Sequence, residues 1–470
     1  MEGQLWGIGL STLVQTKKSM YDEFSDPAGA SVIKFEQMLK TDKIQYFDAQ
    51  EFETITQHYL DNGQNNMAKR ALKLGLEQHP NNIELLLVKS ELFVFDSEFS
   101  EAESLLNLVD QLSPQNEEVF LQRANIHSKR KEHQEAIAML NRALLLTEDP
   151  LDVWSLLGME YLLVENYEAA AKYFKLCLKE TPLDYQSLYN ILYCFEHLEK
   201  PQEAIFILNE VLEEHPYCEV AWHQLGKIYT QTKRYEEALS AYEFALISDD
   251  TFTGAYVEKG KLLEQLGRLN EAIENYQIAM QTSDPGGYAY HRIGVCHLQL
   301  GNKQLGVNFL KESIHLEPHF EKSWMGLIDF FLKENNNEKA LYYCKKGLQA
   351  NEDSVQLWKK NGEIHYSMKH YSEADYAYEN TVALGNYELE SWIQWIDSLL
   401  HLQESNKALK IGLQARQFYP ETPTIAIRVS RCYHTLGKKD ESQYFNRAFS
   451  KDQSLVAQMA HFFPNLVVKS

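Results

Sequence analysis

Histidine and cysteine are the residues of this chain that could hold a metal ion or act as nucleophiles. His315 and His319 are four residues apart, the interval at which two histidines on one helix hold zinc. Pro318 lies between them and interrupts a helix, so we do not expect the two side chains to share a face. The six cysteines are scattered without a Cys-x-x-Cys pair, at Cys177, Cys194, Cys218, Cys296, Cys344 and Cys432. This spacing fits neither a zinc ribbon nor a disulfide framework, and it favours a reducing compartment.

The motifs of other common catalytic sites are missing from the sequence. It contains no glycine-rich phosphate loop, no His-Glu-x-x-His motif, no calcium loop and no nucleophile elbow. We therefore predict that the chain is not an enzyme and that it has no catalytic residue, no cofactor and no metal site.

The charge balance narrows the class of partner. The 470 residues include 67 acidic and 45 basic residues, which gives a formal net charge of −22. Nucleic-acid binding requires basic surface to neutralise phosphates, so we expect no nucleic-acid partner. No stretch approaches the roughly 18 apolar residues of a membrane span, and the N-terminus lacks the order of a secretory signal. These features predict a cytoplasmic protein without membrane insertion, whose native start is either Met1 or Met20.

Two residue types recur along the chain with a period of 34 residues. The first series is small at every position: Ala68, Ala102, Ala136, Ala170, Ala204, Ala238, Ala272, Gly306, Ala340, Ala374, Ala408 and Ser442. The second series lies sixteen residues upstream and is mostly aromatic: Phe52, Leu86, Phe120, Trp154, Leu188, Trp222, Tyr256, Tyr290, Trp324, Trp358, Trp392 and Ala426. Two independent series with one period and no insertion indicate an internal repeat.

Within one repeat, numbered 1 to 34 from residue 49 onward, the spacing predicts two helices and a tight turn. Positions 4, 8 and 11 fall on one stripe of a helix, and positions 17, 20 and 24 restart that period. A small residue at position 20 lets the two helices approach closely. Position 15 ends the first helix and suits a left-handed residue. It is glycine at Gly63, Gly267, Gly301 and Gly437.

Position 8 is usually small but is large in three repeats. The exceptions are Leu192, Ile328 and Ile396. We expect a larger residue there to open the local helix pair.

The segment from Trp222 to Ala245 resembles the tetratricopeptide repeat, whose aromatic–Leu–Gly–Tyr–Ala pattern it follows through Leu225, Gly226, Tyr229 and Ala238. The resemblance implies an all-α fold. It would be a right-handed α-solenoid, or superhelix, of about twelve helix-turn-helix units with short terminal capping helices. The unbroken spacing without an added domain is most similar to uncharacterised bacterial proteins that consist of these repeats alone.

The repeat frame divides the chain into three parts. Residues 1–48 are expected to form an N-terminal extension with a capping helix, and residues 1–30 are expected to be flexible. Residues 457–470 are expected to form a C-terminal capping segment. Twelve repeats occupy residues 49–456, with bounds 49–82, 83–116, 117–150, 151–184, 185–218, 219–252, 253–286, 287–320, 321–354, 355–388, 389–422 and 423–456.

In proteins of this family the first helix of each repeat lines a concave groove, chiefly through positions 2, 5, 6 and 9. Repeats one to three place only acidic charges at these positions, namely Glu53, Glu84, Glu91 and Glu118. Repeats four and five supply an apolar and aromatic patch with Leu156, Met159, Tyr189, Asn190 and Tyr193.

Repeats six to ten place mostly basic charges at the same positions. Their bases are Lys227, Lys261, Arg292, Lys322, Lys359 and Lys360. Their acids are Glu258, Asp329 and Glu363, which leaves a charge of +3. Interleaved with them are His223, Tyr288, His291 and Met325. We expect these bases and interleaved residues, together with Tyr189 and Tyr193, to bind a partner. Charge would steer an acidic or carboxylate-ended peptide, and aromatic contact would hold it.

Two classes of function remain open. The first is a non-catalytic protein–protein interaction scaffold or adaptor that binds a partner segment in the groove, with an acidic peptide in the basic part. The alternative is a regulatory or assembly factor for an enzyme or a membrane-associated complex. Such a factor would act through the convex face or through the basic C-terminal tip, residues 423–470. In both classes the partner is a protein or peptide, which the sequence does not identify.

Overall fold

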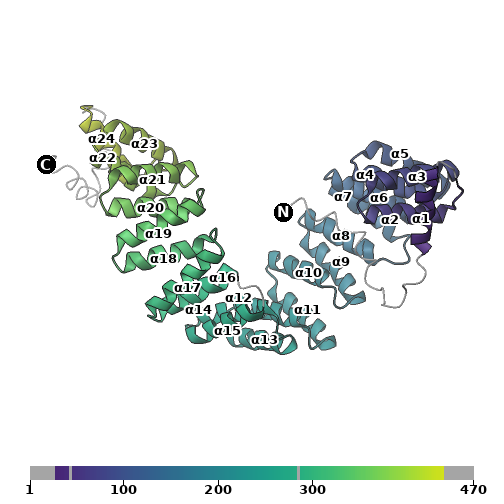
Figure 1. The fold of residues 1–470 in the computed structure, drawn as a ribbon, viewed down its shortest axis with the longest axis horizontal. Helices are drawn as coiled ribbons and strands as arrows, with labels where there is room; N and C mark the ends of the chain where they lie inside the picture. The colour runs from purple at the N-terminus through teal and green to yellow at the C-terminus, as the bar shows by residue number, and fades with distance from the viewer. Residues whose placement is uncertain (1–26, 42–44, 283–285, 439–470) are drawn as a thin grey trace. The chain divides into compact units, whose positions relative to one another are not determined.

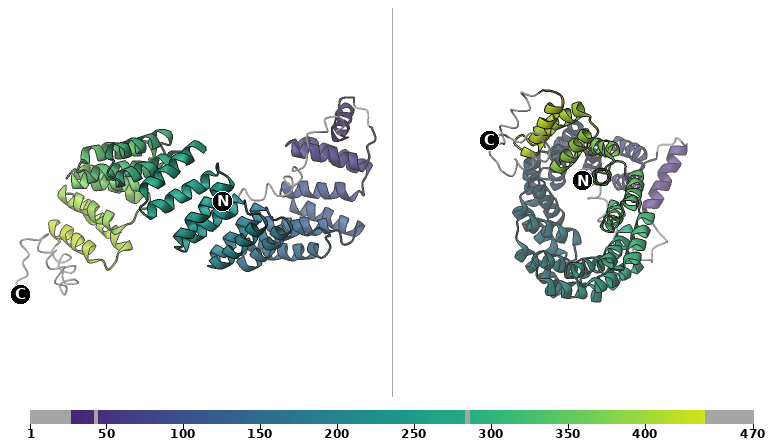
Figure 2. Two further views of the ribbon diagram at one scale, coloured as in Figure 1. Left: turned by 90° about the horizontal axis from the view of Figure 1, so that it is seen from below. Right: turned by 90° about the vertical axis from the view of Figure 1, so that its left-hand side faces the viewer.

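The computed structural model describes residues 27–41, 45–282 and 286–438, and every regular element in these residues is an α-helix (Figure 1). The chain divides into two compact units, Met1–Glu214 and His215–Ser470. Within each unit, helices that follow one another in the chain pack side by side (Figure 2). The expected all-α helical-repeat fold is therefore confirmed.

The helices of the first unit are α1 Pro27–Thr41, α2 Ala49–Asp61, α3 Asn65–Gln78, α4 Ile83–Phe95, α5 Phe99–Leu112, α6 Glu117–Lys129, α7 His133–Leu144, α8 Leu151–Leu163, α9 Tyr167–Glu180, α10 Tyr185–His197 and α11 Pro201–Glu214. Helix α1 begins at Pro27, inside the segment 1–30 that is expected to be flexible. Phe35 of α1 is fully buried against Phe47 and Phe52, at ring-centroid distances of 6.0 and 6.3 Å. This helix covers the first helix pair.

The helices of the second unit are α12 Glu219–Gln231, α13 Tyr235–Ser248, α14 Thr253–Gln265, α15 Leu269–Thr282, α16 Gly287–Gln299, α17 Lys303–Leu316, α18 Glu321–Lys333, α19 Asn337–Ala350, α20 Val355–Ser367, α21 Tyr371–Ala383, α22 Leu389–His401, α23 Ser405–Phe418 and α24 Pro423–Thr435. From α2 onward, even-numbered helices begin 34 residues apart, as do odd-numbered helices from α3. The expected C-terminal capping segment, 457–470, lies outside the described residues.

The turn between the two helices of each pair has one conformation throughout the described residues. Position 15 has a positive φ after each of the twelve first helices from α2 to α24, between 54° and 81°. The amide of the following residue donates to the carbonyl five residues upstream, as Gln64 does to Tyr59 at 2.8 Å. This is the Schellman arrangement that satisfies the last carbonyls of a helix. The sequence showed it only where the residue is glycine. In the other eight turns the position holds a residue with a side chain, such as Lys233 or Glu199.

Close approach within each helix pair rests on complementary sizes at positions 8, 20 and 24. The described alanines at position 20 are at most 3% exposed. At Gly226, position 8, an added Cβ atom would lie 2.4 Å from Cε1 of the fully buried Tyr242, at position 24. Gly158 meets Phe174 in the same way, so that the aromatic ring occupies the space beside the glycine.

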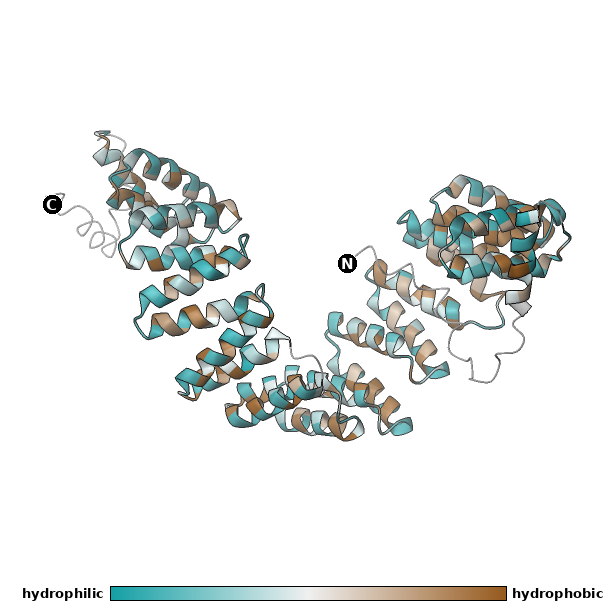
Figure 3. Cartoon of the chain, in the orientation of Figure 1, coloured by the Kyte–Doolittle hydropathy of each residue, from teal (hydrophilic) through white to brown (hydrophobic). Residues whose placement is uncertain are grey.

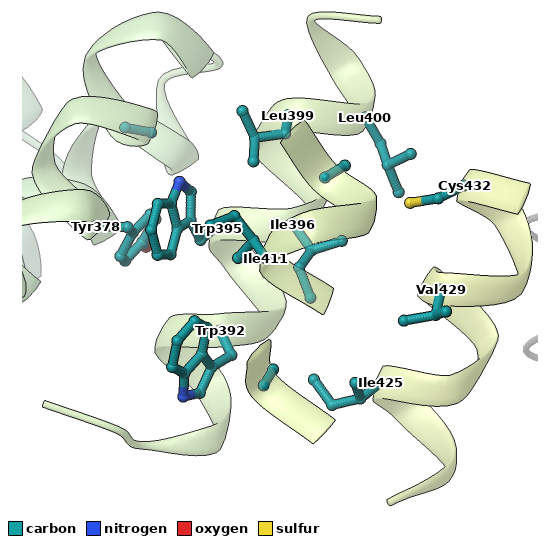
Figure 4. Close-up of a cluster of buried hydrophobic side chains, with 13 residues drawn as sticks. Tyr378, Trp392, Trp395, Ile396, Leu399, Leu400, Ile411, Ile425, Val429 and Cys432 are labelled. Atoms are coloured by element: carbon teal, nitrogen blue, oxygen red, sulfur yellow. The ribbon is translucent and has the colours of Figure 1, made fainter. Parts of the chain in front are cut away.

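Where position 8 is large, position 24 is small in two of the three pairs. Ile328 is fully buried in one core cluster with Cys344, and Ile396 shares a cluster with residues around Gly412. Figure 4 shows the latter cluster, in which Ile396 lies among Trp392, Trp395 and Ile411. A smaller partner therefore leaves room for the larger residue in these two pairs. In the third pair, α10 and α11, both positions hold leucine, Leu192 and Leu208.

The aromatic residues at position 4 connect one pair of helices to the previous one. The indole Nε1 atoms of Trp222 and Trp324 donate to the carbonyls of Pro216 and Pro318, both at 2.8 Å. Trp392 is fully buried, whereas Trp222 is half-buried and stacks on Phe244 with centroids 4.8 Å apart. Figure 3 shows hydrophobic and hydrophilic residues alternating along the helices.

The contact between Gly226 and Tyr242 predicts the effect of one added methyl group. We expect Gly226→Ala to destabilise the chain by about 1–3 kcal/mol, because the ring must move out of its packed position. Gly254→Ala is the matched control, since its added Cβ meets nothing closer than 3.7 Å. It should leave stability unchanged or raise it by up to about 1 kcal/mol, because alanine favours the helix over glycine. Urea unfolding followed by circular dichroism measures both, and equal midpoints would contradict the packing argument.

The left-handed turns predict that a glycine can stabilise this chain. Glu199 is exposed and has a φ of 54°, a conformation that costs a residue with a side chain about 1–2 kcal/mol. A glycine at this position would avoid that cost, but part of the gain is offset by the greater conformational freedom of glycine in the unfolded chain. We expect Glu199→Gly to stabilise the chain by about 0.5–1 kcal/mol in thermal unfolding. Glu196→Gly, three residues earlier in helix α10, should instead destabilise it by about 1 kcal/mol.

Candidate functional site

The residues predicted to bind a partner all lie on first helices of the pairs. Positions 2, 5, 6 and 9 of these helices are called here the first-helix face. Neighbouring first helices touch, as α12 touches α14 and α16 touches α18. The candidates are Tyr189 and Tyr193 on α10, His223 and Lys227 on α12, Lys261 on α14, Tyr288, His291 and Arg292 on α16, Lys322 and Met325 on α18, and Lys359 and Lys360 on α20. The two tyrosines belong to the first unit and the others to the second.

The tyrosines of α10 form an uncharged aromatic surface. Tyr189 and Tyr193 are 43% and 48% exposed. The Tyr193 ring lies 4.4 Å from the ring of His197, which stacks on Tyr167 at 4.6 Å. These contacts hold one face of the Tyr193 ring and leave the rest of it available for an apolar or aromatic contact.

The two candidate histidines occupy equivalent places, two repeats apart. His223 is half-buried with its ring edge-on to Phe252 at 5.2 Å, and neither ring nitrogen has a hydrogen-bond partner in the described residues. Burial, aided by the charge on Lys227, lowers the pKa of His223 to about 4. The ring is therefore neutral at physiological pH.

His291 is buried and makes one polar contact. Its Nδ1 atom lies 3.1 Å from the Ser323 hydroxyl, and its ring lies edge-on to Phe320 at 5.4 Å. Burial, with the nearby charges of Arg292 and Lys322, lowers the pKa of His291 to about 4. Neither histidine adds positive charge to the first-helix face.

Four of the six candidate bases are already neutralised by carboxylates of the chain. Lys261 pairs with Glu258 at 2.8 Å. The Arg292 guanidinium donates to both oxygens of Glu264, at 2.8 and 2.6 Å. Lys359 pairs with Glu388, and Lys360 pairs with Glu363 at 3.2 Å and with Asp329 at 3.3 Å.

Lys227 and Lys322 differ from these four bases. Both are exposed, and neither forms an ion pair with any described residue. Lys227 follows His223 by four residues, one turn along α12, and the charge of Lys322 lowers the pKa of His291. The charge available to a ligand on this face is therefore concentrated at two lysines.

The remaining candidates supply apolar and aromatic surface. The Tyr288 ring lies 6.3 Å from the Phe320 ring, and the Lys261 ammonium is 5.4 Å from the Tyr288 centroid. Met325 is half-buried against the core cluster around Trp324. Tyr288 and Met325 thus border the histidine positions without forming an enclosed site of their own.

The acids that neutralise Arg292 and Lys359 were not found from the sequence. Glu264 is at position 12 and Glu388 at position 34 of their repeats, outside the four positions that were read. Glu264 lies 28 residues upstream of Arg292, in the preceding repeat, whereas Glu388 lies 29 residues downstream of Lys359, at the end of the same repeat. The signal was therefore an acid just under one repeat away from the base, on either side of it.

Chemically reactive groups are few in the described residues. His315 lies in α17 and His319 beyond its end, so the two histidines do not share a helix face. Burial raises the pKa of Cys194 to about 11 and of Cys296 to about 12, which keeps both thiols protonated at neutral pH. No group of three histidine, cysteine, aspartate or glutamate side chains within the described ranges is placed to hold a metal ion. Nor is any described helix both long and apolar enough to cross a membrane.

The environment of the two histidines predicts their titration. With pKa values near 4, His223 and His291 should stay neutral between pH 8 and pH 5.5, whereas an unperturbed histidine gains a proton near pH 6.5. NMR spectroscopy of the chain labelled with ¹³C at histidine Cε1 measures this, with His223→Gln and His291→Gln used for assignment. A midpoint above pH 6 for either signal would show that its ring is hydrated.

Comparison with known proteins gives matches to one family. Two models described as tetratricopeptide repeat match the chain, one at residues 220–246, 253–281 and 287–320 and the other at residues 155–217. Anaphase-promoting complex subunit 3 of Schizosaccharomyces pombe is 26% identical over 149 residues, which are 32% of this chain and 22% of that protein. DnaJ homolog subfamily C member 3 of Rattus norvegicus is 26% identical over 225 residues, with 44% of each chain covered. The chain thus spans less than half the length of either relative.

Solved structures give partial superpositions. The APC/C hetero-tetramer Cut9-Hcn1 matches with a TM-score of 0.35 and 14% identity, covering 86% of this chain and 93% of that one. The Naa15/Naa10 complex bound to HypK-THB matches with a TM-score of 0.39 and 13% identity, covering 88% and 66%. The family models match two adjoining stretches, and helix pairs of the same 34-residue period continue on both sides of them. The chain is a tetratricopeptide repeat protein.

Proposed function

We propose that this protein is a non-catalytic interaction scaffold or adaptor that binds an acidic segment of a protein partner. The segment would lie on the first-helix face of α12 to α20, in the repeats numbered six to ten. The division of residues 49–456 into twelve repeats, with bounds as above, and a cytoplasmic location are parts of the same proposal. Matched relatives include a subunit of a large complex, which is consistent with a scaffold role.

The observation that carries the proposal is the isolation of Lys227 and Lys322. Each is an exposed cation without an ion-pair partner among the described residues, beside a neutral and largely buried imidazole. A carboxylate bound there gains a charge partner without displacing an existing one. The adjacent Phe252 and Phe320 rings add apolar contact.

Neutral histidines suit an acidic partner for a second reason. The nitrogens of His223 are buried and without a partner in the described residues, so a ligand that turns the ring outward gains a donor or an acceptor for a hydrogen bond. Because the ring is uncharged, this bond does not depend on pH near neutrality. The two lysines therefore supply the charge, and the imidazole of His223 supplies a hydrogen bond that does not depend on pH near neutrality.

The charges of Lys227 and Lys322 can be tested with a simple acidic probe. We expect Lys227→Gln/Lys322→Gln to weaken binding of a fluorescein-labelled hexa-aspartate peptide about tenfold, which corresponds to about 1.4 kcal/mol. Fluorescence anisotropy in 50 mM salt measures the affinity, since exposed charges are strongly screened at higher ionic strength.

The matched control is Lys311→Gln/Lys346→Gln, which removes the same charge from the second helices α17 and α19. Both of these lysines are exposed and make no ion pair within the described ranges. The control should bind the probe within twofold of the parent chain. If both double variants bind as the parent does, the first-helix face is not the site. The convex face or the C-terminal tip would then be favoured.

A further inference from the structure

The first unit carries the opposite charge on its first-helix face. Its acids at positions 2, 5, 6 and 9 are Glu53, Glu84, Glu91, Glu118 and Asp152, and these positions hold no base in α2, α4, α6, α8 or α10. The partner segment proposed above lies on the basic repeats, and this acidic part has no role in its binding. Two of its helices, α4 and α6, touch directly and bring several of these groups together.

Glu118, Gln122 and Asn125 lie on one face of helix α6, at successive intervals of four and three residues. The amide nitrogen of Gln122 donates to the Leu87 carbonyl of α4 at 3.2 Å and to Glu118 Oε1 at 3.3 Å. These two acceptors fix the orientation of the amide, which leaves Gln122 Oε1 as the outstanding acceptor.

That acceptor has no donor. Gln122 is only 7% exposed, and its Oε1 atom has no hydrogen-bond partner in the described residues. Asn125 Oδ1, one turn further along the same face, is likewise without a donor. A buried acceptor without a partner costs free energy, and structures normally avoid leaving one. The site thus has an excess of acceptors and lacks donors.

The nearby bases are committed elsewhere. Arg123 turns toward α5, where it meets Asn107 at 2.7 Å and Glu103 at 3.5 Å. Lys129 donates to the Val94 carbonyl at 3.4 Å, and Lys89 lies over the Phe93 ring at 5.8 Å. No cation of the described residues neutralises Glu91 or Glu118.

The two carboxylates of this site are less stable in their charged form than they would be in water. Desolvation by the surrounding helices raises the pKa of Glu118 to about 7, and the charges of Glu91 and Glu117 add to the shift. Desolvation also raises the pKa of Glu91, although that side chain remains accessible to solvent. A bound cation would favour the charged form of both groups and offset the cost.

We propose that helices α4 and α6 form a binding site for an arginine side chain of an extended partner segment. Glu91 and Glu118 would accept its charged hydrogen bonds, and Gln122 with Asn125 would supply further acceptors. A guanidinium fits this set better than an ammonium group, because it presents five donors in a planar fork and is more weakly hydrated. The protein would then bind two partner segments of opposite charge, one on each unit.

A labelled hexa-arginine peptide tests this site directly. In 150 mM salt, Glu91→Gln/Glu118→Gln should weaken its binding at least tenfold, measured by fluorescence anisotropy. The matched control is Glu101→Gln/Glu135→Gln, which removes the same charge from exposed positions on the second helices α5 and α7. It should bind within twofold of the parent chain. Equal affinity for both variants, or an equal loss in both, would refute the site.

Two further measurements separate binding from folding. At pH 8 the Glu91→Gln/Glu118→Gln variant should melt at the same temperature as the parent or a few degrees higher, because it removes two poorly solvated charges. A lower melting temperature together with lost binding would assign the acids to the fold. Hexa-lysine should bind the parent at least threefold more weakly than hexa-arginine, and equal affinities would overturn the preference for a guanidinium. Binding of hexa-aspartate to the second unit should not change.

Discussion

The distance between the two helices of a pair governs the rest of this structure. A glycine at position 8 admits an aromatic ring from position 24 against the backbone, as Gly226 admits Tyr242. A fully buried alanine at position 20 keeps the same separation on the other side of the contact. Because interiors are packed densely, one added methyl group is felt across such a contact. Pairs with a glycine at position 8 therefore pack in the same way, and they recur along the chain at a constant interval.

A repeated geometry gives equivalent positions equivalent surroundings. His223 and His291, two repeats apart, both lie edge-on to a phenylalanine and have similarly low pKa values. The first-helix face takes no part in the close contact, so its residue types can change without disturbing the pair. It is acidic on the first unit and largely basic on the second. Packing thus constrains the residues inside each helix pair, while the residues of the first-helix face vary from repeat to repeat.

Features inside one repeat could be predicted from the sequence, and contacts between repeats could not. The period, the buried alanines and the glycine turns follow from spacing and residue size, which one repeat contains. The pairing of Arg292 with Glu264 joins two repeats, and so does the contact of His291 with Ser323. Such contacts depend on the angle at which neighbouring pairs stack, which no local pattern encodes. The small Cys344 that accommodates the large Ile328 could also be predicted from the sequence, because both lie in one repeat and only positions 8 and 24 need to be compared.

Net charge is a poor guide to what such a surface binds. An exposed ion pair contributes little to stability, yet each of its two charges is largely neutralised by the other. Lys261 and Lys360 must give up their own carboxylates before they can hold those of a ligand, so they add little attraction. Lys227 has no such partner to give up, and Glu118 on the first unit has no base to hold it. Unpaired charges at partly desolvated positions therefore decide the partner. A chain with a net charge of −22 can hold an acidic segment and a basic one at different places.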